Sequence, residues 1–251
     1  HYHEYFKRLE FWIFNFLAKF FMPIIISKLR LWDYLAAQRV DYFIANSFNT
    51  ASRILKYYKR ESEVIYPWID INSFPFVDKK KDYYFYIWRV VPYKKFDLLV
   101  DTFNKNGKNL IIATNTNNWL YRWLKAASKP NIKWAFWITD EEKKKYFAEA
   151  KAFLFPAEED FWIVPIEAMA CGTPVIAYKK WGSLETVREN HKYMDSTWVF
   201  FEEQTVESLN KAIEKFELLN FDYAKIREHA YNFDISVFKK KFIEFVEEKL
   251  M

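Results

Sequence analysis

The sequence predicts an α/β protein built on a doubly wound parallel sheet. From about residue 79 to residue 201, short apolar runs alternate with amphipathic helical stretches. Strands buried on both faces read as short continuous apolar runs, and each parallel pair needs a crossover that is usually a helix. The chain has 251 residues, 51% of them hydrophobic, so it can bury a large core.

Residues 1–75 hold too few strands for a complete sheet. We expect strands at 41–45 and 63–66, and between them a helix at 48–58 that begins after the cap candidates Asn46 and Ser47. The chain begins with His1 instead of a methionine. We therefore expect residues 1–75 to be the remnant of a truncated N-terminal domain and its crossover.

Residues 76–220 are expected to hold the complete sheet. Strands are predicted at 83–87, 110–113, 132–137, 153–155, 174–177 and 199–201. Helices are predicted at 96–104, 120–127, 140–148, 165–170, 183–189 and 206–218. Asp140 lies near one helix cap, Pro165 suits a first turn and Ser183 can cap another helix. Residues 221–251 would be a helical tail.

The helical tail has one predicted helix, at 237–249. Asp234 or Ser236 is its cap candidate. We expect this helix and the one at 206–218 to pack across the sheet.

The charge pattern does not predict nucleic-acid binding. The formal net charge is +5, and lysines stand in short runs at 79–81, 143–145 and 239–241, which are typical of solvated helix or loop faces. No nucleic-acid motif accompanies them. Cys171 is the only cysteine, which excludes an internal disulfide and a cysteine-rich metal site and makes a reducing cytoplasm the default location.

The longest apolar stretch is at 11–26. Asn15, Lys19 and Pro23 interrupt it, so its pieces are too short to span a bilayer. Two interpretations stay open. The stretch is a helix whose packing partners lie outside this chain, or it lies in the membrane interface with Lys19 outward, which would place the protein at the inner face of the membrane.

Cationic residues follow the first strand of the predicted sheet. Arg89 comes directly after this strand, and Lys94 lies just before the next helix. In open parallel sheets, ligands bind at the carboxyl ends of the strands, so both cations could reach one anion such as a diphosphate. The alternative is an ordinary surface loop.

Two carboxylates flank the start of the helix predicted at 165–170. Glu159 lies in the loop after the strand at 153–155, and Glu167 follows on the helix. One carboxylate could hold sugar hydroxyls and the other ribose hydroxyls, while the backbone N–H groups of residues 161–164 face a diphosphate. The alternative is ordinary acidity at a helix start.

A third strand end carries the segment 179–183. Its loop contains Gly182 and leads into the helix that Ser183 caps, so backbone could approach a ligand closely there.

The segment FPAEEDFWIVPIEAMACGTPVIAYKKWGSLETV, beginning at Phe155, resembles the signature of family 4 glycosyltransferases, which have two Rossmann-like domains in the GT-B arrangement. Glu159 and Glu167 meet the family's E-x7-E pattern, and Arg89 and Lys94 align with its donor-phosphate residues. DYFIANS, VIYP and a D-x-x-x-F ending resemble the end of the first domain and the crossover into the second. The resemblance covers residues 41–219.

This resemblance implies a retaining hexosyltransferase of polysaccharide or lipopolysaccharide assembly, with no metal and no other cofactor. The donor would be a nucleotide-diphosphate sugar, with GDP-mannose the first choice, and the acceptor a saccharide or a lipid-linked saccharide. Arg89 and Lys94 would stabilise the leaving diphosphate, Glu159 would hold sugar hydroxyls and Glu167 the ribose. The implied donor-binding residues are Trp88, Phe161, Trp162, Ile163, Val164, Glu167 and Gly182.

Tryptophan stands where the family pattern has glycine. The chain has 3 glycines and 11 tryptophans, against roughly 18 glycines expected at this length. We hypothesise that the source reads UGA as glycine and that this sequence was translated with UGA as tryptophan. The alternative is a genuinely altered paralogue. The six positions are Trp68, Trp88, Trp137, Trp162, Trp181 and Trp198.

Other functions stay open. A nucleotide-sugar-binding module or pseudoenzyme without turnover would fit a truncated first domain and a blocked diphosphate site. Within the same fold, a nucleotide-sugar epimerase or a sugar phosphorylase would use a similar site.

Overall fold

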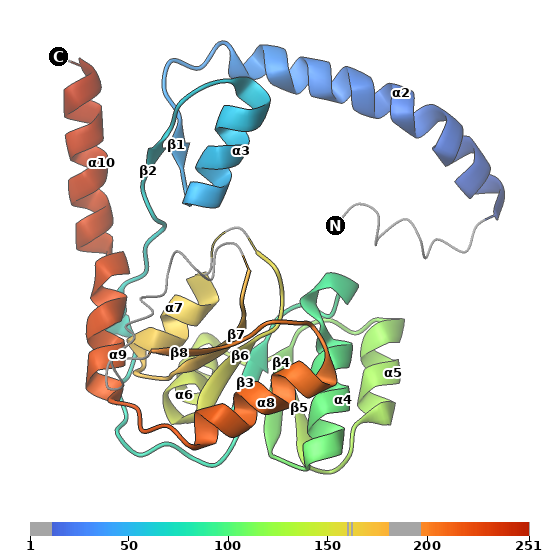
Figure 1. The fold of residues 1–251 in the computed structure, drawn as a ribbon, viewed down its shortest axis with the longest axis vertical. Coiled ribbons are helices and arrows are strands. Elements are labelled where there is room, and N and C mark those ends of the chain that lie inside the picture. The colour runs from blue at the N-terminus through green and yellow to red at the C-terminus, as the bar shows by residue number, and fades with distance from the viewer. Residues whose placement is uncertain (1–11, 160, 162, 181–196, 251) are drawn as a thin grey trace. The chain divides into compact units, whose positions relative to one another are not determined.

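The computed structural model describes residues 12–159, 161, 163–180 and 197–250, with side chains from residue 21 onward (Figure 1). The chain divides into two compact units, His1–Ile65 and Tyr66–Met251. The domain boundaries expected at 75/76 and 220/221 stay predictions.

In its described part, residues 12–65, the first unit contains two helices and a two-stranded parallel sheet. Helix α3 (Phe48–Tyr58) has the predicted bounds, because Ser47 Oγ accepts a hydrogen bond from Thr50 N at 3.0 Å and caps its first turn. Strands β1 (Ile44–Ala45) and β2 (Glu63–Val64) are shorter than predicted.

Helix α2 (Trp12–Ala37) covers most of the apolar stretch and continues past it. Large apolar side chains along its described part are exposed, including Ile24, Leu31 and Trp32. Within the ranges that the structure describes, no helix is both long and apolar enough to cross a membrane.

The second unit is built on a six-stranded parallel sheet, which confirms the predicted fold class. Its strand order is β5-β4-β3-β6-β7-β8, the order of a doubly wound fold in which the sheet grows first one way and then the other. The strands are β3 (Tyr84–Ile87), β4 (Leu110–Thr114), β5 (Ile132–Phe136), β6 (Ala152–Phe155), β7 (Val175–Tyr178) and β8 (Trp198–Phe201).

Helices cover this sheet. Helix α4 contacts α5 and α8, whereas α7 contacts α6 and α9, as expected for layers on the two faces of the sheet (Figure 1). The helices are α4 (Phe96–Asn106), α5 (Trp119–Ala127), α6 (Asp140–Glu149), α7 (Ile163–Ala170), α8 (Val206–Glu217), α9 (Tyr223–Ala230) and α10 (Ile235–Leu250).

Aromatic side chains fill the centre of the unit. Phe85 and Phe153 lie on neighbouring strands, are fully buried, and each packs its ring against Phe147 of α6. On β3, Tyr86 is also fully buried and packs edge-on against Phe96 at 4.9 Å. The central strands thus read as continuous apolar runs because both faces of the sheet are covered.

One helix was missed, one expectation needs correction, and one lies outside the described residues. Helix α9 was not predicted. Helix α10 buries no residue, so it does not pack across the sheet as expected. The helix predicted at 183–189 lies outside the described residues.

The lysine run at 79–81 is not simply a solvated face. Lys80 Nζ donates to the carbonyls of Ala148 and Cys171, at 2.7 and 3.0 Å, and to Thr173 Oγ1 at 2.9 Å. Burial lowers the pKa of Lys80 to about 8. Its side chain thereby ties the ends of α6 and α7 together, a role that the sequence pattern did not indicate.

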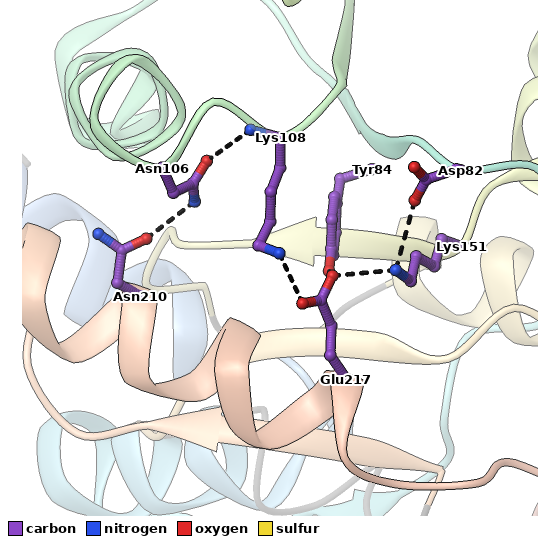
Figure 2. A network of polar contacts seen from close by, with 7 residues as sticks. All are labelled: Asp82, Tyr84, Asn106, Lys108, Lys151, Asn210 and Glu217. Atoms are coloured by element: carbon purple, nitrogen blue, oxygen red, sulfur yellow. Dashed lines mark hydrogen bonds and ion pairs between the residues drawn. The ribbon is translucent and has the colours of Figure 1, made fainter.

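A polar network fixes the end of α8 at the amino ends of the strands (Figure 2). The Glu217 carboxylate contacts Lys108 Nζ at 2.5 Å, Lys151 Nζ at 2.9 Å and Tyr84 Oη at 3.0 Å. Partial burial acts to raise the pKa of Glu217, but these hydrogen bonds outweigh it and lower the pKa to about 2. The network therefore lies at the opposite end of the strands from their carboxyl ends, where ligands are expected.

Glu217→Gln should lower the free energy of unfolding by about 1 kcal/mol at neutral pH, a modest value because solvent screens the lysines. Since the folded pKa is below the unfolded value near 4.5, the charged form stabilises the fold above pH 4.5, and this stabilisation fades as pH falls towards 2. Denaturant unfolding between pH 2 and 7 measures it. Glu214→Gln, exposed on the same helix, is the control, and equal losses for both variants would contradict the network's role.

Candidate functional site

The candidate site lies where the strand order of the sheet reverses. Strands β3 and β6 are neighbours. From β3 the sheet continues through β4 in one direction, and from β6 it continues through β7 in the other. Loops after two such strands diverge and leave a crevice at their carboxyl ends, which is where doubly wound proteins bind ligands. Arg89 and Lys94 follow β3 and Glu159 follows β6, so the topology brings these three predicted residues to one place.

The loop after β3 is held by specific hydrogen bonds. Tyr86 Oη donates to the Lys94 carbonyl at 2.6 Å, and Asn118 Nδ2 donates to the Val90 carbonyl at 2.8 Å. Asn118 also caps α5. The loop that carries the cations is therefore fixed from the strand below it and from the neighbouring helix.

Lys94 and Glu159 form an ion pair across the strand-order reversal. Lys94 Nζ lies 2.6 Å from Glu159 Oε1, and the two side chains are 5% and 26% exposed. The ammonium also lies 3.1 Å from the centre of the Trp88 ring. Burial lowers the pKa of Lys94, the hydrogen bond to Glu159 opposes this, and the Arg89 charge lowers it further.

Arg89 is exposed beside this pair. Because its charge acts on the Lys94 ammonium, two cations face the same region. Glu159 neutralises one of them, so an anion that replaced this carboxylate would meet both charges. This arrangement suits a diphosphate.

The segment at the start of α7 is anchored by an aromatic contact. The Phe161 ring stacks on Tyr66 at 5.6 Å and lies 6.2 Å from the Phe233 ring. Ile163 is exposed, and Val164 packs against the core. Trp162 lies outside the described residues, so the expectation that the backbone of 161–164 faces a diphosphate stays a prediction.

Glu167 lies on α7 in a second group of charges. Lys143 Nζ on α6 is 3.1 Å from Glu167 Oε1 and 2.9 Å from Asp140 Oδ1. Burial raises the pKa of Glu167 while Lys143 opposes it, and the hydrogen bond from Lys143 lowers the pKa of Asp140. The interpretation of 143–145 as a solvated run is therefore wrong for Lys143, which the lysine pattern alone could not reveal.

The loop after β7, which contains the segment 179–183, is described only as far as Lys180. Gly182, Trp181 and the cap candidate Ser183 lie outside the described residues. The close backbone approach expected there stays a prediction.

Two of the tryptophans at expected glycine positions are poorly accommodated. Trp137 has φ of +56°, in the left-handed region that glycine favours and bulky residues avoid. The Trp88 Nε1 group is buried with no hydrogen-bond partner among the described residues.

Two others are well accommodated. Trp198 Nε1 donates to Met169 Sδ at 3.1 Å, and Trp68 is exposed near the Phe238 ring. The glycine hypothesis therefore draws structural support at positions 88 and 137, and it stays a hypothesis.

The doubly wound six-stranded sheet is that of a Rossmann-like domain of the GT-B glycosyltransferase type. The model of the family described as glycosyl transferases group 1 matches residues 70–233, well over half of the chain. The chain belongs to this family. The expected relation to family 4 glycosyltransferases is thereby confirmed.

Individual relatives are distant. The O-antigen chain mannosyltransferase RfbU of Salmonella typhimurium is 23% identical over 220 residues, which cover 82% of this chain and 59% of RfbU. This chain thus spans about three fifths of that relative.

Solved structures share the fold. Anabaena Alr3699/HepE in complex with UDP and glucose has a TM-score of 0.70 and 20% identity, covering 88% of this chain and 67% of HepE. A glycosyltransferase from Rickettsia africae ESF-5 has a TM-score of 0.70 and 17% identity, covering 83% of this chain and 63% of its own.

The Lys94–Glu159 pair should respond asymmetrically to mutation. Glu159→Ala leaves a buried ammonium without its carboxylate and should cost about 2–3 kcal/mol of unfolding free energy. Lys94→Met leaves a partly exposed carboxylate and an apolar chain against Trp88, and should cost less than about 1 kcal/mol. Denaturant unfolding of both variants and the double variant measures the difference. A larger loss for Lys94→Met would contradict the geometry described here.

Peptide sequencing by mass spectrometry of the protein from its native source should show glycine at positions 68, 88, 137, 162, 181 and 198. Trp134 is an internal control, because its ring stacks on Phe96 and its Nε1 donates to Ser128 Oγ at 3.0 Å. It should be read as tryptophan. Intact tryptophan at the six positions would reject the glycine hypothesis.

Proposed function

We propose that this chain is the donor-binding part of a retaining glycosyltransferase that moves a hexose from a nucleotide-diphosphate sugar to a saccharide or lipid-linked acceptor. The observation that carries the proposal is the Lys94–Glu159 pair at the strand-order reversal, with Arg89 exposed beside it. GDP-mannose is the proposed donor.

In the proposed reaction, the diphosphate takes the place of Glu159 at Lys94. Lys94 then contacts a phosphate as a buried point charge, while Arg89 binds the diphosphate as a planar fork from the exposed side. Both cations stabilise the negative charge that develops as the diphosphate leaves, and they do so without a metal. Glu159, released from Lys94, accepts hydrogen bonds from the sugar hydroxyls.

The rest of the donor would lie along α7. Glu167 accepts from the ribose hydroxyls, and the N–H groups at residues 161–164 hold the phosphate or the sugar. The acceptor hydroxyl attacks from the face that the diphosphate leaves, and the departing phosphate takes up its proton, so the anomeric configuration is retained. Acceptor recognition would belong mostly to the N-terminal domain.

Relatives support a nucleotide-sugar donor and a polysaccharide product. HepE has been solved with UDP-glucose, and RfbU is described as an O-antigen chain mannosyltransferase. We place the reaction in the cytoplasm. The exposed apolar side chains of α2 are consistent with contact at the inner face of the membrane.

A non-catalytic sugar-nucleotide-binding module is the second candidate. One observation favours it for the sequence as it stands: the Trp88 ring covers the Lys94 ammonium at 3.1 Å and competes with a phosphate for it. Glycine at position 88 would remove this obstacle. The two candidates therefore differ in whether the donor turns over once positions 88 and 162 are glycine.

The proposed function can be tested by calorimetric titration of GDP-mannose into the chain carrying Trp88→Gly and Trp162→Gly. Binding is expected there, and Arg89→Ala on this background should weaken it about tenfold to hundredfold through loss of a charge-assisted contact. Release of GDP from the bound donor would favour the enzyme over the module.

Lys125→Ala, which removes an exposed cation on α5, is the matched control and should leave the affinity unchanged. The proposed function fails if neither GDP-mannose nor UDP-glucose binds the glycine variant. It also fails if Lys125→Ala weakens binding as much as Arg89→Ala.

A further inference from the structure

The charged group on α6 and α7 lies next to the proposed ribose site. Helix α6 starts at the carboxyl end of β5, where a capping box fixes its first turn: Thr139 Oγ1 accepts from Glu142 N, and Glu142 Oε2 accepts from Thr139 N. Asp140 and Lys143 are three residues apart on this helix, so they share one face. That face meets Glu167 of α7.

The three side chains form a row from the interior to solvent. Glu167 is 15% exposed, Lys143 is 23% exposed and Asp140 is 64% exposed. We place the base of a ribose held by Glu167 along this row, because Lys143 contacts both Glu167 and Asp140. The first groups that the base meets are then the Lys143 ammonium and the Asp140 carboxylate. Asp140 Oδ2 also lies 3.3 Å from Lys144 Nζ, so a base bound at Asp140 would displace or share this second lysine.

An ammonium beside a carboxylate matches the edge of one nucleobase. Guanine presents the acceptor O6 next to the donors N1–H and N2–H, so Lys143 can donate to O6 while Asp140 accepts both N–H groups. Uracil presents one N–H between two carbonyl oxygens, so a second carboxylate oxygen would face a carbonyl. Adenine offers its amino group next to the unprotonated N1, an acceptor that would repel the carboxylate.

We infer that Asp140 and Lys143 recognise the base of the donor nucleotide and select guanine over uracil. This inference rests on the proposed function, because it takes Glu167 to be the ribose-binding residue. It assigns the base-recognition role to α6. The competing explanation is a purely structural ion pair that ties α6 to α7, which would affect all nucleotides alike.

The test measures the ratio of affinities for GDP and UDP by calorimetry, on the full chain with Trp88→Gly and Trp162→Gly. GDP should bind at least tenfold more tightly than UDP. Asp140→Asn should weaken the affinity for GDP about tenfold to hundredfold, because one acceptor oxygen is replaced by an amide N–H group that faces the guanine N2–H. The same variant should change the affinity for UDP by less than about twofold. Lys143→Met should weaken GDP more than UDP.

Lys145→Met is the matched control, because this lysine is exposed on the same helix. It should leave both affinities unchanged. Equal binding of GDP and UDP, or an equal loss of both in Asp140→Asn, would overturn the assignment while the proposed function stands. If neither nucleotide binds, the proposed function fails and this assignment fails with it.

Discussion

The parallel pairing of β3 with β6 is the interaction on which the rest of the structure depends. It joins the two halves of the sheet at the point where strand order reverses. Phe85 and Phe153 bury themselves at this junction. The same pairing brings the two loops with Lys94 and Glu159 to the carboxyl ends of the strands, so packing at the centre of the sheet sets these charges side by side.

The two edges of the sheet use charge in different ways. At the amino ends of the strands, the Glu217 carboxylate accepts hydrogen bonds from Lys108, Lys151 and Tyr84, so its charge contributes to stability. At the carboxyl edge, Lys94 has one carboxylate partner and Arg89 stands exposed. A nucleotide sugar can separate such an ion pair at little cost. Its phosphates become the new partner of the lysine and its sugar hydroxyls the new partner of the glutamate.

Glycine and tryptophan have opposite consequences where the backbone takes a positive φ or where a ligand must come close. Gly172 takes φ of +72° after α7, where a Cβ atom would lie 2.6 Å from the Phe76 ring. Trp137 takes a similar φ with an indole attached. Trp88 places a ring on the cation that a phosphate needs. In the proposed function, donor binding therefore depends on whether the source inserts glycine or tryptophan at position 88.

The sequence by itself determined the sheet, most helix bounds and the identity of Arg89, Lys94, Glu159 and Glu167 as candidates, because apolar periodicity, caps and a long local motif are all encoded over short distances. Only the tertiary structure decided which charges are partners. Lys80 and Lys143 stand in runs that look solvated, yet each is drawn inward by groups that are distant in sequence. Burial and pairing of this kind depend on crossovers between strands, and a local pattern carries no information about them.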